Sequence, residues 1–530
     1  SRKVMDLLMQ LQSQAPSSGG RVHVVIGNHE LMNLTGDMRY VAVEEFAAFA
    51  ADEPRGAREA AFTAYLQPTE TDAETERAAA RREFDSRFPA GYFGHREQFA
   101  ATGQYGAWLL NQPLMVVLNE TVFVHGGLPP VAGRIPLEEI NEAYTRDVTE
   151  LMALGARLEQ AGWVSSEKDL LLQDNTVLGH VQSADAAADP ELLAAARRFV
   201  ALARGELFGI ASPNWYRGTA LCHRTLEQPV LAAALENLKA QRVVVGHTPT
   251  SNLRVQQRLD GRVLLADTGM LHSHYGGQPA PVIITDDKLE ILYPLQETSS
   301  DAPDYLHPLQ LHGLHPDALE AFLTDGAISS TSAAATPDGS TRVTIEFDDK
   351  SLDAHFKPGS RQQSKLKVAA YRLSRMLELN LVPVTVARSV GGRTGVLTAL
   401  PAELMSETTR TAAQHGRSNW CGVGNDYQLM YAFDALILNE QRTTESMIYD
   451  QQNWQLYLTG HAASFGSGTG TPRYLANIRK VMPGSLAADL AKLSETRLEA
   501  ELGEQLGNRQ IRALLKRRDR LIESWTETEQ

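Results

Sequence analysis

Short apolar runs alternate with longer polar, alanine-rich stretches over the first 296 residues of this 530-residue chain, a pattern typical of a mixed α/β fold. The apolar runs are rich in valine, isoleucine and leucine, which predicts strands. Two helix-favouring inserts, at about residues 44–100 and 137–205, are predicted to cover the sheet. The strands are expected at residues 21–26, 113–118, 121–124, 242–245, 263–266, 280–285 and 289–293, with a turn at Asp286-Asp287 between the last two.

The composition changes after residue 296. Residues 297–340 are rich in Ser, Thr, Asp, Pro and His, as in ETSSDAPDY and SSTSAAATPDGS, which predicts a linker. We therefore expect a first domain over residues 1–296 and a second over residues 341–530. Near the end, RQIRALLKRRDRLIESW has one apolar face at helical spacing and predicts a solvated terminal helix.

The charge balance narrows the classes of partner. The chain has 50 basic and 64 acidic residues, a formal net charge of -14, which argues against non-specific binding to nucleic acid or to an anionic membrane. No apolar run reaches the roughly 18 residues that a membrane span needs. Cys222 and Cys421 are too far apart for a metal knuckle and too few for a disulfide scaffold, so we expect both to serve packing. The sequence predicts neither the oligomeric state of the protein nor its cellular compartment.

Three polar motifs each follow directly after a predicted strand. They are GNHE at residues 27–30, HGGLPP at residues 125–130 and GHTP at residues 246–249. Because sites in α/β sheets are assembled at the carboxyl ends of strands, the repetition predicts side chains that converge, as metal ligands do. Taken singly, each motif also fits a simple turn or a hydrogen-bonded core histidine. The glycines expected to give tight turns with positive φ, and close approach of the backbone, are Gly27, Gly126, Gly127 and Gly246.

Together GNHE, VHGGLPP and VVVGHTP resemble the motifs of the calcineurin-like metallophosphoesterases, in particular the bacterial serine/threonine phosphatases of Shewanella-like type. The resemblance implies a four-layer αββα sandwich with helical inserts. It implies hydrolysis of phosphomonoesters in a small molecule or a phosphoprotein. It also implies two divalent metal ions, manganese, iron or zinc, that polarise the phosphoryl oxygens and activate a water.

The resemblance assigns roles to individual residues. His29 corresponds to the general acid that protonates the departing alcohol oxygen, and Glu30 to the partner that orients it. Arg217, in the motif WYRG, is a candidate clamp for the substrate phosphate, with a surface salt bridge as the alternative. The implied ligands of one of the two metals are Asn28, His125 and His247.

The chain also departs from the family pattern. Members carry Asp-x-His and Gly-Asp-x-x-Asp-Arg-Gly motifs upstream of GNHE, and neither occurs in this sequence before residue 27. We interpret the chain as an N-terminally truncated form that is itself inactive. Two alternatives stay open: a noncatalytic scaffold that binds phosphorylated ligands, and a phosphodiesterase or dinucleotide polyphosphatase.

The C-terminal part resembles the atypical kinase-like fold in AHFKPGS, in VAAYRLSRMLELNLVPVTVAR and in the stretch from YAFDALILNEQRTTES onward. The resemblance implies a second α+β domain in which Lys357 would hold nucleotide phosphates. The other functional positions depart from the family, with Lys367, Gln441, Ser446 and Gly460 where acidic or metal-binding groups are required. We therefore predict a pseudokinase-like binding module.

Overall fold

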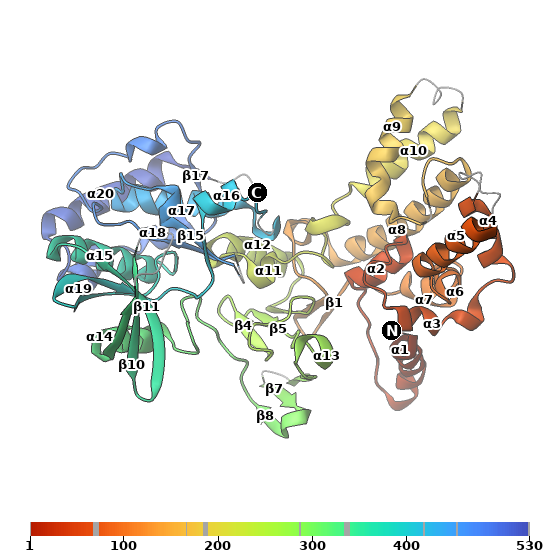
Figure 1. Cartoon of the computed structure of the whole chain (residues 1–530), viewed down its shortest axis with the longest axis horizontal. Coiled ribbons are helices and arrows are strands. Elements are labelled where there is room, and N and C mark those ends of the chain that lie inside the picture. Colours follow the sequence, from red (N-terminus) through yellow and green to blue (C-terminus); the bar gives the residue numbers. More distant parts are fainter. Residues whose placement is uncertain are drawn as a thin grey trace. The chain divides into compact units, whose positions relative to one another are not determined.

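The computed structural model describes residues 2–66, 74–165, 167–183, 189–285, 288–332, 340–416, 419–451 and 454–527 (Figure 1). The chain divides into two units. Unit 1 consists of Ser1–Ala220, Ala233–Val255 and Asp260–Ala302, and unit 2 consists of Leu221–Ala232, Gln256–Leu259 and Pro303–Gln530.

The central sheet of unit 1 contains the strands that precede two of the three polar motifs. Its strands are β1 (Met115–Leu118), β2 (Thr121–Val124), β3 (Arg242–Val245) and β5 (Val263–Leu265), in that order across the sheet. The first pair is antiparallel, and β2, β3 and β5 are parallel. The bounds of β2 and β3 are those that the sequence predicts. Since Val124 pairs with Val245, the residues that follow these two strands emerge side by side.

A smaller antiparallel sheet completes the strands of unit 1. It consists of β6 (Val282–Thr285), β7 (Lys288–Tyr293) and β8 (Thr298–Ser300), and the turn expected at Asp286-Asp287 lies outside the described residues. The buried side chains of Ile291 and Tyr293 pack with Val255. The mixed α/β class is as expected, and the four-layer sandwich stays a prediction.

The strand predicted at residues 21–26 is wrong. This run belongs to no helix or strand, and it makes one backbone-to-backbone hydrogen bond with another segment, from Ile26 N to Pro113 O at 3.0 Å. A strand needs a ladder of such bonds. The apolar pattern of this run reflects partial burial, since Ile26 is 1% exposed while Val24 and Val25 are half-buried.

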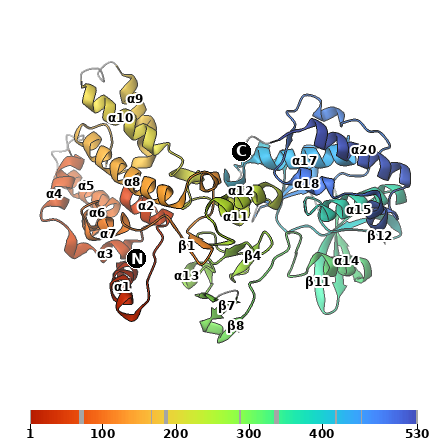
Figure 2. The same cartoon turned by 180° about the vertical axis from the view of Figure 1, so that it is seen from behind.

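Both predicted inserts are helical (Figure 2). Each has an apolar core of its own. In the first, Phe62, Phe84 and Phe88 pack together, and in the second Leu151, Val177 and Phe199 do so. The helices of the first insert and its flanks are α1 (Arg2–Gln14), α2 (Asn28–Thr35), α3 (Val43–Ala47), α4 (Ala57–Leu66), α5 (Glu74–Arg87), α6 (Tyr92–Phe99) and α7 (Gln104–Leu109). Those that follow are α8 (Leu137–Gln160), α9 (Asp174–Gln182), α10 (Pro190–Ala203), α11 (Gly218–Leu221), α12 (Arg224–Asn237) and α13 (His272–Tyr275).

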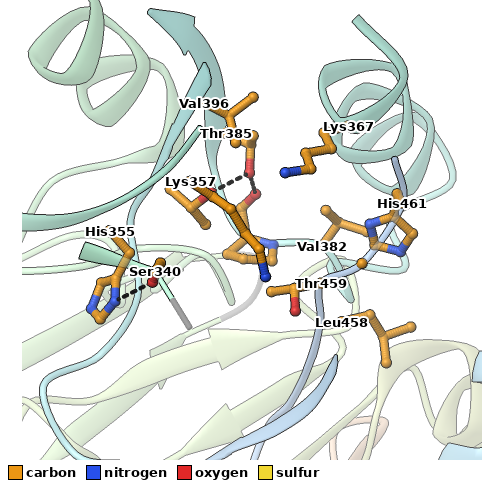
Figure 3. Close-up of a pocket in the computed structure, with 13 residues that line it drawn as sticks. Ser340, His355, Lys357, Lys367, Val382, Thr385, Val396, Leu458, Thr459 and His461 are labelled. Atoms are coloured by element: carbon orange, nitrogen blue, oxygen red, sulfur yellow. Dashed lines mark hydrogen bonds between the residues drawn. The ribbon is translucent and has the colours of Figure 1, made fainter. Parts of the chain in front are cut away.

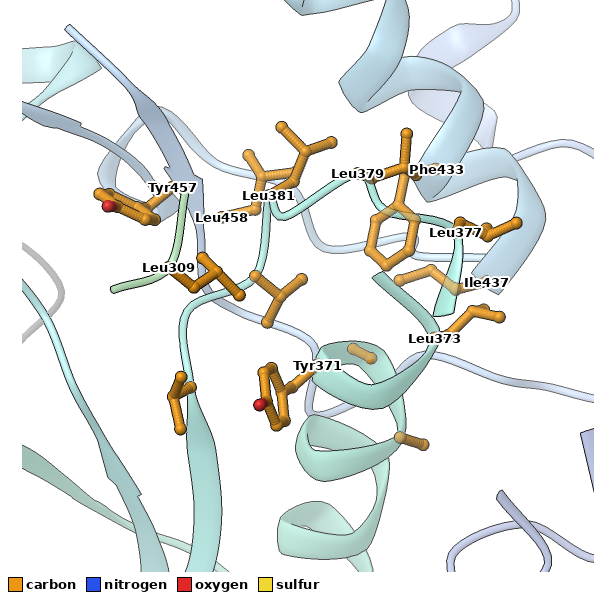
Figure 4. Close-up of a cluster of buried hydrophobic side chains, with 14 of the residues drawn as sticks. Leu309, Tyr371, Leu373, Leu377, Leu379, Leu381, Phe433, Ile437, Tyr457 and Leu458 are labelled. Carbon is orange, nitrogen blue, oxygen red and sulfur yellow. The ribbon is translucent and has the colours of Figure 1, made fainter. Parts of the chain in front are cut away.

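Unit 2 is built on an antiparallel sheet of order β12-β13-β11-β10-β9. The apolar face of α15 covers it, and Tyr371 and Leu373 of this helix enter a large buried cluster (Figure 4). The strands of unit 2 are β4 (Gln256–Arg258), β9 (Ala327–Ser332), β10 (Thr341–Phe347), β11 (Lys350–Pro358), β12 (Thr385–Val390), β13 (Arg393–Thr398), β14 (Leu404–Ser406), β15 (Met447–Asp450), β16 (Leu456–Leu458), β17 (Val481–Met482) and β18 (Thr526–Glu527). Its helices are α14 (Pro316–Asp325), α15 (Arg361–Met376), α16 (Glu407–Ala412), α17 (Val423–Ile437), α18 (Leu486–Ala491), α19 (Glu495–Leu502) and α20 (Asn508–Ser524).

Two expectations for this part of the chain need correction. Part of the expected linker is ordered, because α14 buries Leu319 and Phe322 in the core of unit 2 and β9 joins its sheet; residues 333–339 lie outside the description. The terminal helix α20 is only partly solvated, because one face is exposed while the apolar face packs Ile511, Leu514 and Leu521 into the core of unit 2. Its Arg517 is 2% exposed and donates hydrogen bonds to the carbonyl oxygens of Leu436, Gly466 and Gly468, which make burial of the guanidinium tolerable.

The two cysteines form a disulfide, contrary to the packing role expected for them. Cys222 and Cys421 both belong to unit 2, and their Cα atoms are 5.2 Å apart. Their 199-residue separation gives no local signal of pairing, because only the folded chain brings them together.

Candidate functional site

Three of the predicted site residues meet at the carboxyl edge of the sheet in unit 1. His125 directly follows β2, and Gly246, which precedes His247, donates its backbone N–H to His125 O at 2.9 Å. Asn28 is the first residue of α2, after the N-cap Gly27. The His125 Nε2 atom lies 2.7 Å from Asn28 Oδ1 and 2.9 Å from His247 Nδ1. Three donor atoms from distant parts of the sequence therefore converge.

The environment keeps both imidazoles neutral. Burial, helped by the positive charge of Arg217, lowers the pKa of His125 to about 4. Burial, then the charge of Arg217, lowers the pKa of His247 to about 2. A neutral imidazole retains the nitrogen lone pair that binds a metal.

The backbone at His247 is in the left-handed region, with φ of 65°. This conformation is uncommon for a residue other than glycine, and such residues cluster at functional sites. The expectation of positive φ at the motif glycines is wrong: φ of Gly27 is -93°, and Gly126, Gly127 and Gly246 are not among the described glycines with positive φ. The turn after β3 is made by the histidine itself.

The motif glycines do allow close approach of neighbouring groups. A Cβ atom at Gly27 would lie 2.5 Å from Glu30 Oε2 and 3.0 Å from the His125 ring. A Cβ atom at Gly126 would lie 2.8 Å from Pro213 O, the carbonyl that accepts hydrogen bonds from the N–H groups of Gly126 and Gly127. Side chains at these positions would push the site apart.

The remaining predicted residues lie around this centre. His29 is exposed, and its ring stacks on Tyr40 with centroids 5.0 Å apart. The Glu30 carboxylate accepts the Gly27 N–H at 3.1 Å and so caps α2, whereas the sequence led us to expect that it orients His29. Arg217 is half-buried, and its charge lowers the pKa values of His125 and His247.

Trp215 is a neighbour of the site that sequence reasoning missed. Its ring meets the His247 ring edge-on, with centroids 5.8 Å apart and an interplanar angle of 84°. The residue belongs to the motif WYRG, in which only Arg217 was singled out. An aromatic residue two positions before a proposed phosphate clamp is a signal that a search for charged groups alone overlooks.

The donor set suits one divalent ion. Ligands that lie about 2.1 Å from a metal at the right angles of an octahedral site are about 3 Å apart, close to the two distances from His125 Nε2, whereas tetrahedral ligands would be about 3.4 Å apart. His247 Nε2 and Asn28 Nδ2 are buried without a hydrogen-bond partner. Among the described residues, no group of three His, Cys, Asp or Glu side chains could hold a metal. The third donor at this site is an amide, Asn28 Oδ1. Two carboxylates that follow the site motifs or strands in sequence have contacts of their own: Asp37 pairs with Arg39 at 2.6 Å, and Asp267 Oδ1 accepts the Gly269 N–H.

Unit 2 contains a second candidate site (Figure 3). Lys357 from β11, Lys367 from α15, and Gly460 and His461 after β16 line a pocket of about 30 Å³. Burial, with the charges of Arg442 and Lys367, lowers the pKa of His461 well below its ordinary value. Among the described lining residues none is acidic.

The positions expected to match catalytic kinase residues have structural contacts in unit 2. Arg442, which follows Gln441, forms a buried ion pair with Asp434 at 2.8 Å. Arg442 also donates to Ser446 O and Thr459 O. The Ser446 hydroxyl donates to Thr443 O at 2.8 Å and closes a turn. These contacts organise the wall next to the lysine-lined pocket.

Relatives of the chain include proteins named as phosphatases. A protein of Schizosaccharomyces pombe described as uncharacterized is 26% identical over 300 residues, 55% of this chain and 65% of that protein. Shewanella-like protein phosphatase 2 of Arabidopsis thaliana is 30% identical over 148 residues, 26% of this chain and 37% of the relative. Shewanella-like protein phosphatase 1 of Plasmodium berghei is 23% identical over 138 residues, 26% of this chain and 28% of the relative. The chain thus spans less than two thirds of each.

No protein-family model matches the chain. Among solved structures, a mutant of a cold-active protein tyrosine phosphatase aligns with a TM-score of 0.33 and 20% identity, over 56% of this chain and 63% of its own. The Helicobacter pylori proinflammatory kinase CtkA aligns with a TM-score of 0.27 and 9% identity, over 38% of this chain and 92% of its own. Neither alignment is close enough to define the fold. Within the described residues, no helix has the length and apolar character needed to cross a membrane.

Proposed function

We propose that unit 1 carries part of a metal-dependent phosphoesterase site, and that the whole protein hydrolyses phosphomonoesters, including phosphoserine or phosphothreonine in proteins. The observation that carries this proposal is the convergence of Asn28 Oδ1 and His247 Nδ1 on His125 Nε2, at 2.7 and 2.9 Å, beside the charge of Arg217. The names of the relatives from A. thaliana and P. berghei support the same class of reaction.

In this proposal Asn28, His125 and His247 hold one manganese, iron or zinc ion. A bound ion would polarise a phosphoryl oxygen and stabilise developing charge. The Arg217 guanidinium binds phosphate oxygens as a planar pair of donors, and exposed His29 gives a proton to the leaving oxygen. All three ligands are neutral, so a second ion at close range would lack the anionic bridge that offsets the repulsion between two cations. We therefore expect the 530-residue chain to bind one ion weakly and to show no turnover.

Titration of Mn²⁺ into the chain, followed by electron paramagnetic resonance, tests the ligand assignment. We expect one weak site, which His125→Ala and His247→Ala abolish because each removes a nitrogen ligand. The matched control is His180→Ala, whose ring stacks on Trp163 away from the three donors. Two tightly held ions, or unchanged binding in both ligand variants, would refute the assignment.

In a form of the protein that hydrolyses an aryl phosphate, His29→Ala is expected to lower kcat by about 10²- to 10⁴-fold, because it removes a general acid. The Mn²⁺ content should stay the same, since His29 is not among the converging donors. Turnover equal to that of the unmodified protein would remove His29 from the mechanism.

A second proposal concerns unit 2, which we infer to be a noncatalytic binding module. It is supported by the lining of the small pocket, where Lys357 and Lys367 are present and no described side chain is acidic. Nothing in this lining would hold magnesium against a triphosphate. Incubation of the chain with radiolabelled ATP and Mg²⁺ or Mn²⁺ should transfer no phosphate to itself or to casein. Transfer that disappears in Lys357→Ala would contradict this inference.

A further inference from the structure

A larger pocket lies in unit 1, away from the converging donors of the candidate site. It has a volume of about 310 Å³ and lies where the last turn of α2, the end of α6 and the outer face of α8 meet. These helices lie close together in both views (Figures 1 and 2). Its walls are mostly apolar, with Leu34, Phe99, Met152, Ala156 and Leu170 among the lining residues. A pocket of this size with apolar walls is typical of a small-molecule site.

One arginine at this pocket has donors that the protein does not use. The Arg96 guanidinium lies against Gly36, where a Cβ atom would be 3.2 Å from Arg96 Nη1. Its hydrogen bond in the described chain runs from Nη1 to Asn33 O at 3.2 Å, and no described carboxylate forms an ion pair with it. Nε and Nη2 are not among the buried polar atoms that lack a partner, so both remain accessible to solvent.

The charges around Arg96 do not neutralise it. Burial lowers its pKa, and the more distant negative groups Glu159 and Asp169 raise it again. Glu159 and Lys168 are both exposed at the rim of the pocket, and their charges oppose each other. The guanidinium is half-buried and no described carboxylate contacts it, so a carboxylate that reached its two accessible donors would gain charge-assisted hydrogen bonds.

From this geometry we propose that the pocket is a binding site for a small organic carboxylate with an apolar body. The carboxylate would accept hydrogen bonds from Nε and Nη2 of Arg96, the side-on pair of donors that matches two carboxylate oxygens. The apolar body would pack on Phe99, Leu34 and the alanine-rich face of α8. The ligand would touch the last turn of α2, the helix whose first residue is Asn28.

A purely structural role for Arg96 predicts something different. A cation at the C-terminal end of a helix is stabilising by itself, and the contact with Asn33 O is of this kind. That role uses one donor and needs no apolar pocket. The two roles therefore differ in whether an added anion binds more tightly than its neutral analogue.

Calorimetric titration of the chain with octanoate and with octanamide, its uncharged analogue, separates these roles. We expect octanoate to bind about 10- to 100-fold more tightly than octanamide, as for a charge-assisted pair of hydrogen bonds. Arg96→Met should remove that preference and leave octanamide binding unchanged. Arg96→Lys, which keeps the charge but loses the side-on pair of donors, should retain part of it.

A second variant keeps the proposal testable if Arg96→Met does not fold. Ala156 is exposed on α8 and lines the pocket, so Ala156→Phe should fill the pocket and weaken both probes at least 10-fold. Ala194→Phe on α10, at an exposed alanine that does not line the pocket, is the matched control and should change neither. Equal binding of octanoate and octanamide by the unmodified chain, or full binding by Ala156→Phe, would overturn the proposal.

Discussion

His95 is a buried titratable residue with no polar partner for Nδ1 in the described chain. Its ring packs among Phe46, Phe49 and Phe99, with centroids 4.4 to 5.3 Å away. Burial lowers its pKa to about 4 from an ordinary value of 6.5. At a pH between these two values, His95 is therefore neutral in the folded state and protonated in the unfolded state.

This difference makes the stability of unit 1 depend on pH. Between pH 6.5 and about 4 the unfolded chain binds a proton at His95 and the folded chain does not, so the free energy of unfolding decreases as the pH falls. The contribution is about 3 kcal/mol over this interval. His95→Phe, which keeps an aromatic ring in the cluster, is expected to reduce the loss. Urea unfolding at pH 7 and pH 4.5 measures it.

The matched control for His95→Phe is the same substitution at an exposed histidine. His274 is exposed, and His274→Phe should leave the difference in stability between the two pH values unchanged. If His95→Phe loses as much stability on acidification as the unmodified chain, His95 is not the group responsible.

At the scale of single residues, the sequence predicted which side chains could act as ligands better than it predicted their backbone conformation and their neighbours. Two of the three converging donors, His125 and His247, follow from parallel pairing of β2 and β3, which brings the motifs after them to one edge. The third, Asn28, begins α2 after a segment that is not a strand. The left-handed backbone of His247 and the edge-on contact of Trp215 depend on segments far away in the sequence. The sequence also could not predict that Arg96 has unused donors, because the residues next to Arg96 in the sequence do not show which groups pack against its side chain.

Among the helices, α6 depends on a glycine at its start. Gly91 is the N-cap with φ of 89°, and a Cβ atom there would collide with the carbonyl oxygen of Phe46 at the base of the first insert. Gly56 has a similar φ of 80°, but a Cβ atom there would meet nothing within 4 Å. A substitution at Gly56 would therefore cause backbone strain alone, whereas the same substitution at Gly91 would add steric overlap.

Gly91→Ala is expected to lower the free energy of unfolding by about 3 kcal/mol or more, since strain from positive φ and overpacking add. Gly56→Ala should cost about 1 kcal/mol, from strain alone. Urea unfolding followed by circular dichroism measures both. Equal losses would show that the backbone near Phe46 moves aside without cost.

The pattern of apolar runs predicted elements well where each run had partners to pair with. The bounds of β2 and β3 agree to the residue because polar motifs end both runs sharply. Residues 21–26 have the same apolar character but make a single backbone-to-backbone hydrogen bond with another segment. The sequence of a run does not show whether another segment lies beside it to form a strand pair. The polar segment before residue 341 was predicted to be a linker, but part of it forms the helix α14. A few apolar residues of α14 are enough to pack this helix into the core of unit 2.

For the whole molecule, the disulfide is the largest departure from expectation. It closes a loop between Cys222 and Cys421 that contains segments of both units, β3 and β5 among them, and loop closure limits the freedom of the unfolded chain. Replacing both cysteines with serine is expected to lower the free energy of unfolding by about 2–5 kcal/mol under oxidising conditions. Thermal unfolding with and without dithiothreitol measures the change.

The reduced protein provides the control. Dithiothreitol should bring the unmodified chain to the stability of the double variant and leave the variant unchanged. A thiol assay that finds two reactive cysteines in the unreduced, denatured chain would show that the bond does not form. Disulfides persist in oxidising compartments, so the state of this bond in the cell reports on where the protein works.

The same bond alters what a protease can do to this chain. A single backbone cut anywhere between Cys222 and Cys421 would leave the two products covalently joined. On a denaturing gel without reductant the nicked protein would stay one species, and with reductant it would separate into two. Fragments cut outside this interval would separate in either case, so the gel pair locates a cut relative to the bond.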